Sequence, residues 1–384
     1  MNLNNSTLDD WLISPSSDFL KRGGDDFEYH SKYDVFRSYL GNGLHNEVTK
    51  QAIYNEIKNE QDFDKVIWLN DHGPKHIKAV IERASQLLDT GKDDIQNFIY
   101  SLNAREVFLL LNAIQVHDIG NFYGRHNHEN RVLDAIKNGL TPILFDITEV
   151  KYINDIARVH GGKVKYKDGS KDKNTIRTIR KEIMSNSYPI RLQMLAAILR
   201  FADELAEEKQ RADINSLENG SLPKGSEVFH AFSACIDSIN VNHPKSTVEV
   251  HLKIPKKYVT RTFGKLVFEE GKKRIINVFL LDEIYKRILK MHYERIYCSK
   301  FWKGMIEIEN IWVQIEFYKD FDALSETLDF NELNVHKDIT FNLHDNYYPI
   351  EGDKNIFDHC PELIYENSSK ITGESLKLRI EKDE

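Results

Sequence analysis

The chain has 384 residues, 41% of them hydrophobic and 29% charged, which is typical of a globular protein large enough for two domains or for one domain with a substantial addition. Its net charge of −8 does not indicate a nucleic-acid or membrane partner, and no apolar run approaches the roughly 20 residues of a membrane span. The three cysteines have no paired spacing, which indicates neither a zinc knuckle nor a disulfide framework. We therefore expect a soluble, cytoplasmic protein.

Helical periodicity dominates the chain from about residue 63 to residue 213, and we expect residues 1–62 to form an arm that packs on this part. Pro74 can open the first helix, because the N–H that proline lacks would have no partner in a first turn. Further helices are predicted over residues 93–102, 104–117, 129–137, 147–159, 174–186 and 189–205. The last of these is apolar nearly all round, which marks a central helix.

The pattern changes after residue 212. A turn-forming polar stretch separates the helical part from residues 225–345, which we expect to form a smaller α+β domain. Alternating apolar residues predict strands over residues 247–254, 274–280 and 306–317, with an amphipathic helix over residues 281–297. Residues 346–384 are predicted to be a C-terminal tail, whose charged end should be loosely held.

A histidine and an aspartate, His117 and Asp118, follow the apolar run of residues 107–114. At a helix end both side chains can turn towards one metal ion, although the pair alone could be a capping histidine beside a solvated carboxylate. Four other stretches carry ligand-type residues at predicted helix ends: residues 70–80, 125–129, 157–162 and 200–205. Asp203 lies on the most apolar helix, where a buried carboxylate without a partner would be costly.

The order His…His-Asp…His…His…Asp, carried by helices, resembles the HD-domain superfamily of metal-dependent phosphohydrolases over about residues 68–210. The resemblance implies a mostly α fold, with an HD-type helical bundle over residues 63–213 followed by the α+β domain. It implies that the metal ligands are His76, His117, Asp118 and Asp203, to which members with two metals add histidines such as His128 and His160. Such donors suit one or two ions of Mn, Fe, Co, Ni or Zn, with Mg as a further option.

Asp118, His128 and His160 are the candidate catalytic residues. Lys75, Arg125, Arg158 and Arg200 are candidates for phosphate contacts, although such side chains are more often simply solvated. Two positions stay open: His72 could be a ligand, a substrate contact or a cap, and His126 competes with His128 as a ligand. The chain departs from relatives that hydrolyse cyclic dinucleotides, because no Gly-Tyr-Pro signature follows the His-Asp pair.

The function implied by the resemblance is hydrolysis of a phosphoester or phosphoanhydride bond, in a nucleotide or related small molecule, by a metal-activated water. A nuclease acting on single strands is an alternative that the acidic balance disfavours. The other alternative is a non-catalytic sensor or binding module. We expect a small phosphorylated substrate, no membrane partner, and a C-terminal domain that could support a homo-oligomer or bind a partner protein. The sequence does not identify the substrate, the metal or the number of ions.

Overall fold

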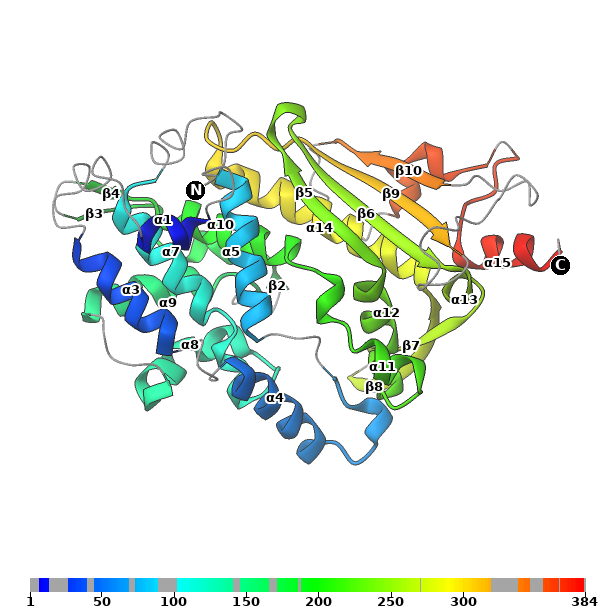
Figure 1. Ribbon diagram of the computed structural model, residues 1–384, viewed down its shortest axis with the longest axis horizontal. Coiled ribbons are helices and arrows are strands. Elements are labelled where there is room, and N and C mark those ends of the chain that lie inside the picture. Colours follow the sequence, from blue (N-terminus) through cyan, green and yellow to red (C-terminus); the bar gives the residue numbers. More distant parts are fainter. Residues whose placement is uncertain are drawn as a thin grey trace. The chain divides into compact units, whose positions relative to one another are not determined.

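A computed structural model of the chain is mostly α-helical with a smaller α+β part, which confirms the expected fold class (Figure 1). The chain divides into two units: unit 1 is Met1–Lys58, His72–Ala206 and Cys298–Glu307, and unit 2 is Asn59–Asp71, Glu207–Tyr297 and Ile308–Glu384. The structure describes residues 7–13, 27–39, 45–68, 73–88, 102–140, 146–165, 171–185, 188–269, 271–318, 338–345, 355–365 and 367–382. Within these ranges, no helix is both long and apolar enough to cross a membrane.

Unit 1 is a helical bundle with a few short ladders. Its helices are α1 (Leu8–Ile13), α3 (Phe27–Tyr39), α4 (His45–Asn59), α5 (Pro74–Leu88), α7 (Ala104–Val116), α8 (Val132–Ala135), α9 (Ile147–Ala157) and α10 (Leu192–Leu205). Shorter turns are η4 (Ile119–Tyr123), η5 (His128–Arg131), η6 (Ile136–Leu140) and η7 (Ile176–Thr178). The ladders pair β1 (Val164–Lys165) with β2 (Lys171–Asp172) and β3 (Ile183–Ser185) with β4 (Tyr188–Ile190).

Helix α10 is central in unit 1, as its apolar sequence predicts, and it contacts α5, α7 and α9 (Figure 1). Its residues 194–202 are all buried. The N-terminus of α7 is fixed by a capping box between Asn103 and Glu106. The fully buried Glu106 carboxylate also accepts hydrogen bonds from Arg191 Nε at 2.8 Å and Nη2 at 2.6 Å. This ion pair ties the start of α7 to the residue before α10.

Unit 2 contains a mixed sheet and several helices. The sheet has the order β10 (Asp338–Leu343), β9 (Asn310–Tyr318), β6 (Thr247–Pro255) and β5 (Ile236–Asn242), with β6 and β9 parallel and the other pairs antiparallel. A separate antiparallel ladder joins β7 (Thr262–Glu269) and β8 (Lys272–Phe279). The helices are α11 (Ile214–Glu218), α12 (Glu227–Cys235), α13 (Lys256–Val259), α14 (Leu280–Trp302) and α15 (Gly373–Lys382).

Short turns complete unit 2: η3 (Phe63–Lys65), η8 (Lys209–Arg211), η9 (Lys224–Ser226), η10 (His243–Lys245), η12 (Ile356–Asp358) and η13 (Pro361–Leu363). Helix α14 runs along the sheet in Figure 1, and Tyr285 on α14 packs edge-on against Phe341 of β10 with ring centroids 5.8 Å apart. The last five residues of α14 belong to unit 1. The three predicted strands and the predicted helix before β9 are therefore present, with shifted ends.

Three expectations from the sequence are wrong. Residues 174–186 are not one helix but contain the turn η7 and the strand β3. The helix expected over residues 129–137 is divided among η5, α8 and η6. The charged end of the chain is not loosely held, since α15 buries Leu376 and Ile380 completely or nearly so. The helix expected over residues 93–102 lies almost entirely outside the described residues.

Candidate metal centre

The six predicted ligands all lie in unit 1, each at or near the end of a helix or turn. His76 is in the first turn of α5, His117 is the C-cap of α7, Asp118 is the N-cap of η4, His128 opens η5, His160 follows α9, and Asp203 is in the last turn of α10. Helix ends let neighbouring side chains turn in one direction, which continuous helix would not allow. The fold thereby directs donors from separate segments towards one point.

The first group of donors is formed by His76, His117 and Asp203. His76 Nε2 lies 3.4 Å from His117 Nε2 and 3.2 Å from Asp203 Oδ1. His117 Nε2 lies 3.5 Å from the same carboxylate oxygen. Two imidazole nitrogens and a carboxylate oxygen that meet at these distances form a group that could hold a metal ion.

Asp118 faces a second group through its other oxygen. Its Oδ2 lies 3.5 Å from His117 Nε2 and 3.8 Å from His76 Nε2, while its Oδ1 lies 3.0 Å from His128 Nε2 and 3.9 Å from His160 Nε2. The rings of His117 and His160 pack edge to face with centroids 4.9 Å apart. One carboxylate therefore lies between two pairs of histidines, in the position of a ligand that could bridge two cations.

Backbone carbonyls orient three of these imidazoles. Nδ1 of His117 lies 2.8 Å from the carbonyl of Ile114, and Nδ1 of His160 lies 2.6 Å from that of Ala157. His128 Nδ1 lies 3.2 Å from the carbonyl of Arg125. A carbonyl only accepts hydrogen bonds, so each Nδ1 donates and each Nε2 is left to bind a proton or a metal.

The environment of His128 Nε2 indicates that a cation is needed between this ring and Asp118. Its buried Nε2 has no hydrogen-bond partner among the residues that the structure describes, although Asp118 Oδ1 lies only 3.0 Å away. A neutral ring nitrogen without a proton and a carboxylate oxygen both carry lone pairs, so they repel each other at this distance. A cation between them removes the repulsion, and this donor set fits a divalent transition metal.

The pKa shifts in the cluster arise from burial and from the close approach of its imidazoles and carboxylates. Burial disfavours the charged form of His117, but the carboxylates of Asp118 and Asp203 outweigh burial and raise its pKa to about 9. Burial and the neighbouring His117 lower the pKa of His160 to about 3. The pKa of Asp203 stays well below its usual value despite burial, because His117 and His76 hydrogen-bond to the carboxylate. Without a metal the cluster therefore holds a proton where a cation would otherwise bind.

The buried Arg200 donates to the carbonyl of Lys173, which corrects the expectation that it contacts phosphate. Of the predicted phosphate-binding residues that the structure describes, only Arg125 lies against the cluster. Its Nη1 lies 3.7 Å from Asp118 Oδ1 and donates to Asn121 Oδ1 at 3.3 Å. Arg158 instead pairs with Asp155 on its own helix at 3.2 Å. Lys75 is exposed next to His76 on α5.

The two histidines left open by the sequence have different outcomes. His126 is exposed, whereas His128 is buried within the cluster, so the geometry favours His128 as the ligand. His72 lies outside the described residues. The prediction did not include Glu129, whose Oε2 lies 3.3 Å from His128 Nδ1. Its only signal in the sequence is its position directly after His128.

Two glycines allow close packing around the cluster. A Cβ on Gly120 would lie 2.0 Å from the backbone oxygen of His128, so only glycine lets η4 and η5 approach this closely. A Cβ on Gly162 would lie 2.5 Å from Glu129 Oε1, and the φ of +73° at Gly162 also favours glycine. The glycines near the motif histidines are therefore packing residues as well as helix breakers.

A separate cluster of histidines lies in unit 2. His292 Nε2 lies 3.3 Å from Asp345 Oδ1, and His359 Nδ1 makes a short hydrogen bond to Asp345 Oδ2. His359 Nε2 lies 3.1 Å from the hydroxyl of Tyr293. His292, Asp345 and His359 could hold a metal ion. Both imidazoles, however, already have the Asp345 carboxylate as a partner. Hydrogen bonding alone is sufficient to explain this cluster.

The family model HD-CE matches residues 62–290, more than half of the chain. The chain belongs to the HD-CE family. This confirms the resemblance to HD domains that the order of the motifs indicates. The matched region includes all six donors of the metal centre and continues beyond α10 into α14, so HD-CE is larger than the helical part alone. A search of curated proteins finds no match to the chain.

Proposed function

We propose that this HD-CE protein is a metal-dependent phosphohydrolase that cleaves a phosphoester or phosphoanhydride bond of a nucleotide or a related small molecule. The observation that carries the proposal is the position of Asp118. One of its oxygens faces His76 and His117, and the other faces His128 and His160. A carboxylate shared between two histidine pairs is suited to two neighbouring cations, an arrangement used by phosphatases.

Each part of the cluster has a task in this reaction. His76, His117 and Asp203 would hold one ion, His128 and His160 would hold a second, and Asp118 would contact both. A bound divalent cation supplies Lewis acidity and activates water near neutral pH. The carbonyls of Ile114 and Ala157 keep two of the rings in the tautomer whose Nε2 can bind metal.

The guanidinium of Arg125 is partly exposed and lies 3.7 Å from Asp118 Oδ1. A guanidinium beside the metal ligands can contact phosphoryl oxygens of a substrate with two N–H groups. The donor set of imidazoles and carboxylates favours Mn, Fe, Co, Ni or Zn over Mg. We therefore propose a transition metal as the cofactor and Arg125 as a substrate contact.

Metal analysis followed by activity assays tests the proposal. The purified protein should contain a divalent transition metal, and Asp118→Ala should lose it, while Asp155→Ala on α9 should retain it. With Mn²⁺ added, the protein is assayed against nucleoside triphosphates, cyclic nucleotides and short single strands. It should release phosphate or pyrophosphate from a nucleoside triphosphate, or open a cyclic nucleotide to the nucleoside monophosphate, and Asp118→Ala should do neither. Activity should fall at least about 100-fold in that variant.

The other outcomes each contradict part of the proposal. Cleavage of short single strands without turnover of mononucleotides would show a nuclease. Bound metal with no turnover of any substrate in the panel would show a sensor or binding module. Absence of metal from protein that is folded and supplied with Mn²⁺ would overturn the metal centre itself.

A further inference from the structure

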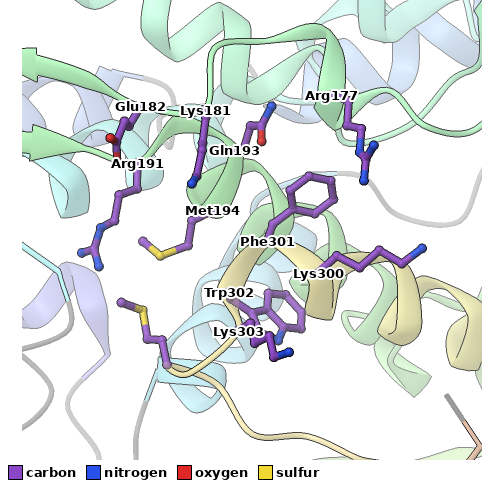
Figure 2. Close-up of a pocket in the computed structure, with 11 residues that line it drawn as sticks. Arg177, Lys181, Glu182, Arg191, Gln193, Met194, Lys300, Phe301, Trp302 and Lys303 are labelled. Atoms are coloured by element: carbon purple, nitrogen blue, oxygen red, sulfur yellow. The ribbon is translucent and has the colours of Figure 1, made fainter.

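Unit 1 contains a cavity of about 590 Å³ that does not include any residue of the metal centre (Figure 2). It is formed by side chains from residues 177–182 and 191–194 and by the end of α14 with the turn that follows it. Its charged lining residues are Arg177, Lys181, Glu182, Arg191, Lys300 and Lys303. Five cationic side chains and one carboxylate therefore surround one cavity, in a chain whose net charge is −8.

The cations of this lining do not all have the same role. Arg191 is paired with the buried carboxylate of Glu106 at 2.6 Å, so its charge is balanced inside the fold. Setting Lys300 aside as well, the lining still has three further cationic side chains, Arg177, Lys181 and Lys303, and the single carboxylate of Glu182. Figure 2 shows Arg177 and Lys181 extending towards the segment that carries Lys300. Like charges collected around a concave surface repel one another and raise the local potential, and a bound anion relieves that repulsion.

The uncharged wall of the cavity is apolar and aromatic. Met194 and Trp302 are buried, and Phe301 is partly exposed at the cavity, with its ring between the two lining segments in Figure 2. The indole Nε1 of Trp302 is buried without a hydrogen-bond acceptor among the described residues. The cavity therefore combines cationic side chains with an apolar, aromatic wall.

The cavity is distinct from the metal centre in position. Gln193 lines the cavity near the start of α10, and Asp203 lies in the last turn of the same helix. Ten residues of α-helix span about 15 Å, so the two sites lie near opposite ends of α10. A small ligand in the cavity therefore does not need the metal ligands in order to bind.

We propose that this cavity binds a phosphorylated molecule with a planar ring, in the chemical class of the nucleotides, independently of the metal centre. The cationic side chains match the charge of phosphate groups, which lysine and arginine bind in many proteins. The partly exposed Phe301 supplies an aromatic ring at the wall of the cavity. The volume lies within the range of small-molecule sites, about 300–1,000 Å³.

Calorimetric titration of the full chain tests the proposal, with ATP, tripolyphosphate and adenosine as probes. The Asp118→Ala variant in the presence of EDTA is the background, because metal-dependent binding and hydrolysis at the metal centre are then removed. We expect one equivalent of ATP to bind saturably, tripolyphosphate to bind more weakly, and adenosine to show no measurable binding. Lys181→Glu/Lys303→Glu in this background should weaken ATP binding at least about tenfold.

A matched control separates a specific site from general attraction of anions. Lys137→Glu/Lys151→Glu makes the same change of charge at two exposed lysines of unit 1 outside the cavity, and it should change ATP affinity less than about twofold. Equal losses in the two double variants, or no saturable ATP binding, would overturn the site. Tripolyphosphate binding as tightly as ATP would overturn the ring-bearing ligand. None of these results depends on hydrolytic activity, so the proposed function can fail separately.

Discussion

At the scale of single residues, the metal centre depends on which nitrogen of each histidine points inwards. Three separate carbonyls fix Nδ1 as the donor in His117, His128 and His160. Each of these carbonyls belongs to the residue three positions earlier in the chain. The backbone just before each histidine therefore determines which ring nitrogen carries the proton. Substitution of the histidine itself removes the ring and does not test this role of the backbone.

The neighbouring histidines His128 and His126 provide a matched pair of variants. His128→Ala removes a buried donor 3.0 Å from Asp118 and should lower the metal content and reduce hydrolysis about 100-fold or more. His126→Ala alters an exposed ring two residues away and should change both less than about twofold. Metal analysis and initial rates with Mn²⁺ measure the effects. Equal losses in the two variants would contradict the assignment of His128.

Gly120 should be intolerant of even a methyl group. Gly120→Ala places a Cβ 2.0 Å from the carbonyl oxygen of His128, so η5 must move and the free energy of unfolding should fall by about 1–3 kcal/mol. Metal content should fall with it, because His128 moves. Gly161→Ala is the control, since a Cβ there has no neighbour within 4 Å. Denaturant unfolding and metal analysis compare the two variants. A wild-type metal content in Gly120→Ala would contradict the dependence of metal binding on the position of His128.

The order and helical context of the motifs predicted which six donors converge. The sequence could not predict which of the neighbouring arginines and lysines contacts the cluster. A residue can be close to a motif in sequence while its long side chain points elsewhere. Arg125 reaches the cluster through the loop after η4, whereas Arg158 is held by Asp155 one turn earlier on α9. Glu129 was missed for a related reason, since its contact with His128 depends on the turn η5 rather than on a regular helix.

At the scale of elements, residues 174–186 show why apolar spacing can mislead. Ile176, Ile179 and Ile183 are three and four residues apart, as on one face of a helix, and all three are buried. They nevertheless lie in a 3₁₀ turn, an irregular residue and a strand. Arg200 of α10 donates to the carbonyl of Lys173 and to Thr175 Oγ1, so α10 anchors the irregular segment before η7. Tertiary contacts of this kind override local propensity.

The long amphipathic elements were predictable because burial and periodicity agree in them. Helices α5, α7 and α10 begin or end within a few residues of the expected limits. The strand β7 was missed even though Phe263 and Leu266 are buried, because glycine and lysine interrupt its alternation. Gly264 is required there by packing, since a Cβ would lie 2.2 Å from the backbone oxygen of Lys224.

The contact between α4 and α7 should make stability depend on pH. His45 Nε2 lies 3.1 Å from Gln115 Oε1, and burial lowers the pKa of His45 to about 4, against the raising effect of this hydrogen bond. The unfolded chain binds the proton at higher pH than the fold does, so stability is complete above about pH 6.5 and falls towards pH 4. His45 should contribute a loss of about 2 kcal/mol between pH 7 and pH 5.

Unfolding of two variants at these two pH values measures the contribution. His45→Gln should lose less stability than the wild type on going from pH 7 to pH 5, because the titrating group is gone. His126→Gln replaces an exposed histidine and should behave as the wild type does. An identical loss in wild type and His45→Gln would contradict the role of His45.

At the scale of the whole molecule, the chain has two units, and all six donors of the metal centre belong to one of them. A ligand that binds only the folded form stabilises the part of the protein that contains its site. Calorimetry should therefore resolve two transitions, and removal of metal with EDTA should lower the midpoint of one by several degrees while the other stays unchanged. A parallel shift of both transitions would contradict this division. Asp118→Ala, already without metal, should show no response to EDTA.

The distance along the sequence between the donors also determines at which stage of folding a cation can bind. Only His117 and Asp118 are adjacent in sequence, and the remaining four donors lie at four other helix or turn ends, from His76 to Asp203. A nascent or unfolded chain therefore offers no preassembled chelate, because bringing such distant donors together requires α5, α7 and α10 to dock first. In the proposed metal centre, binding of a cation would therefore follow folding of this unit, and the already folded protein would take up each ion from solution.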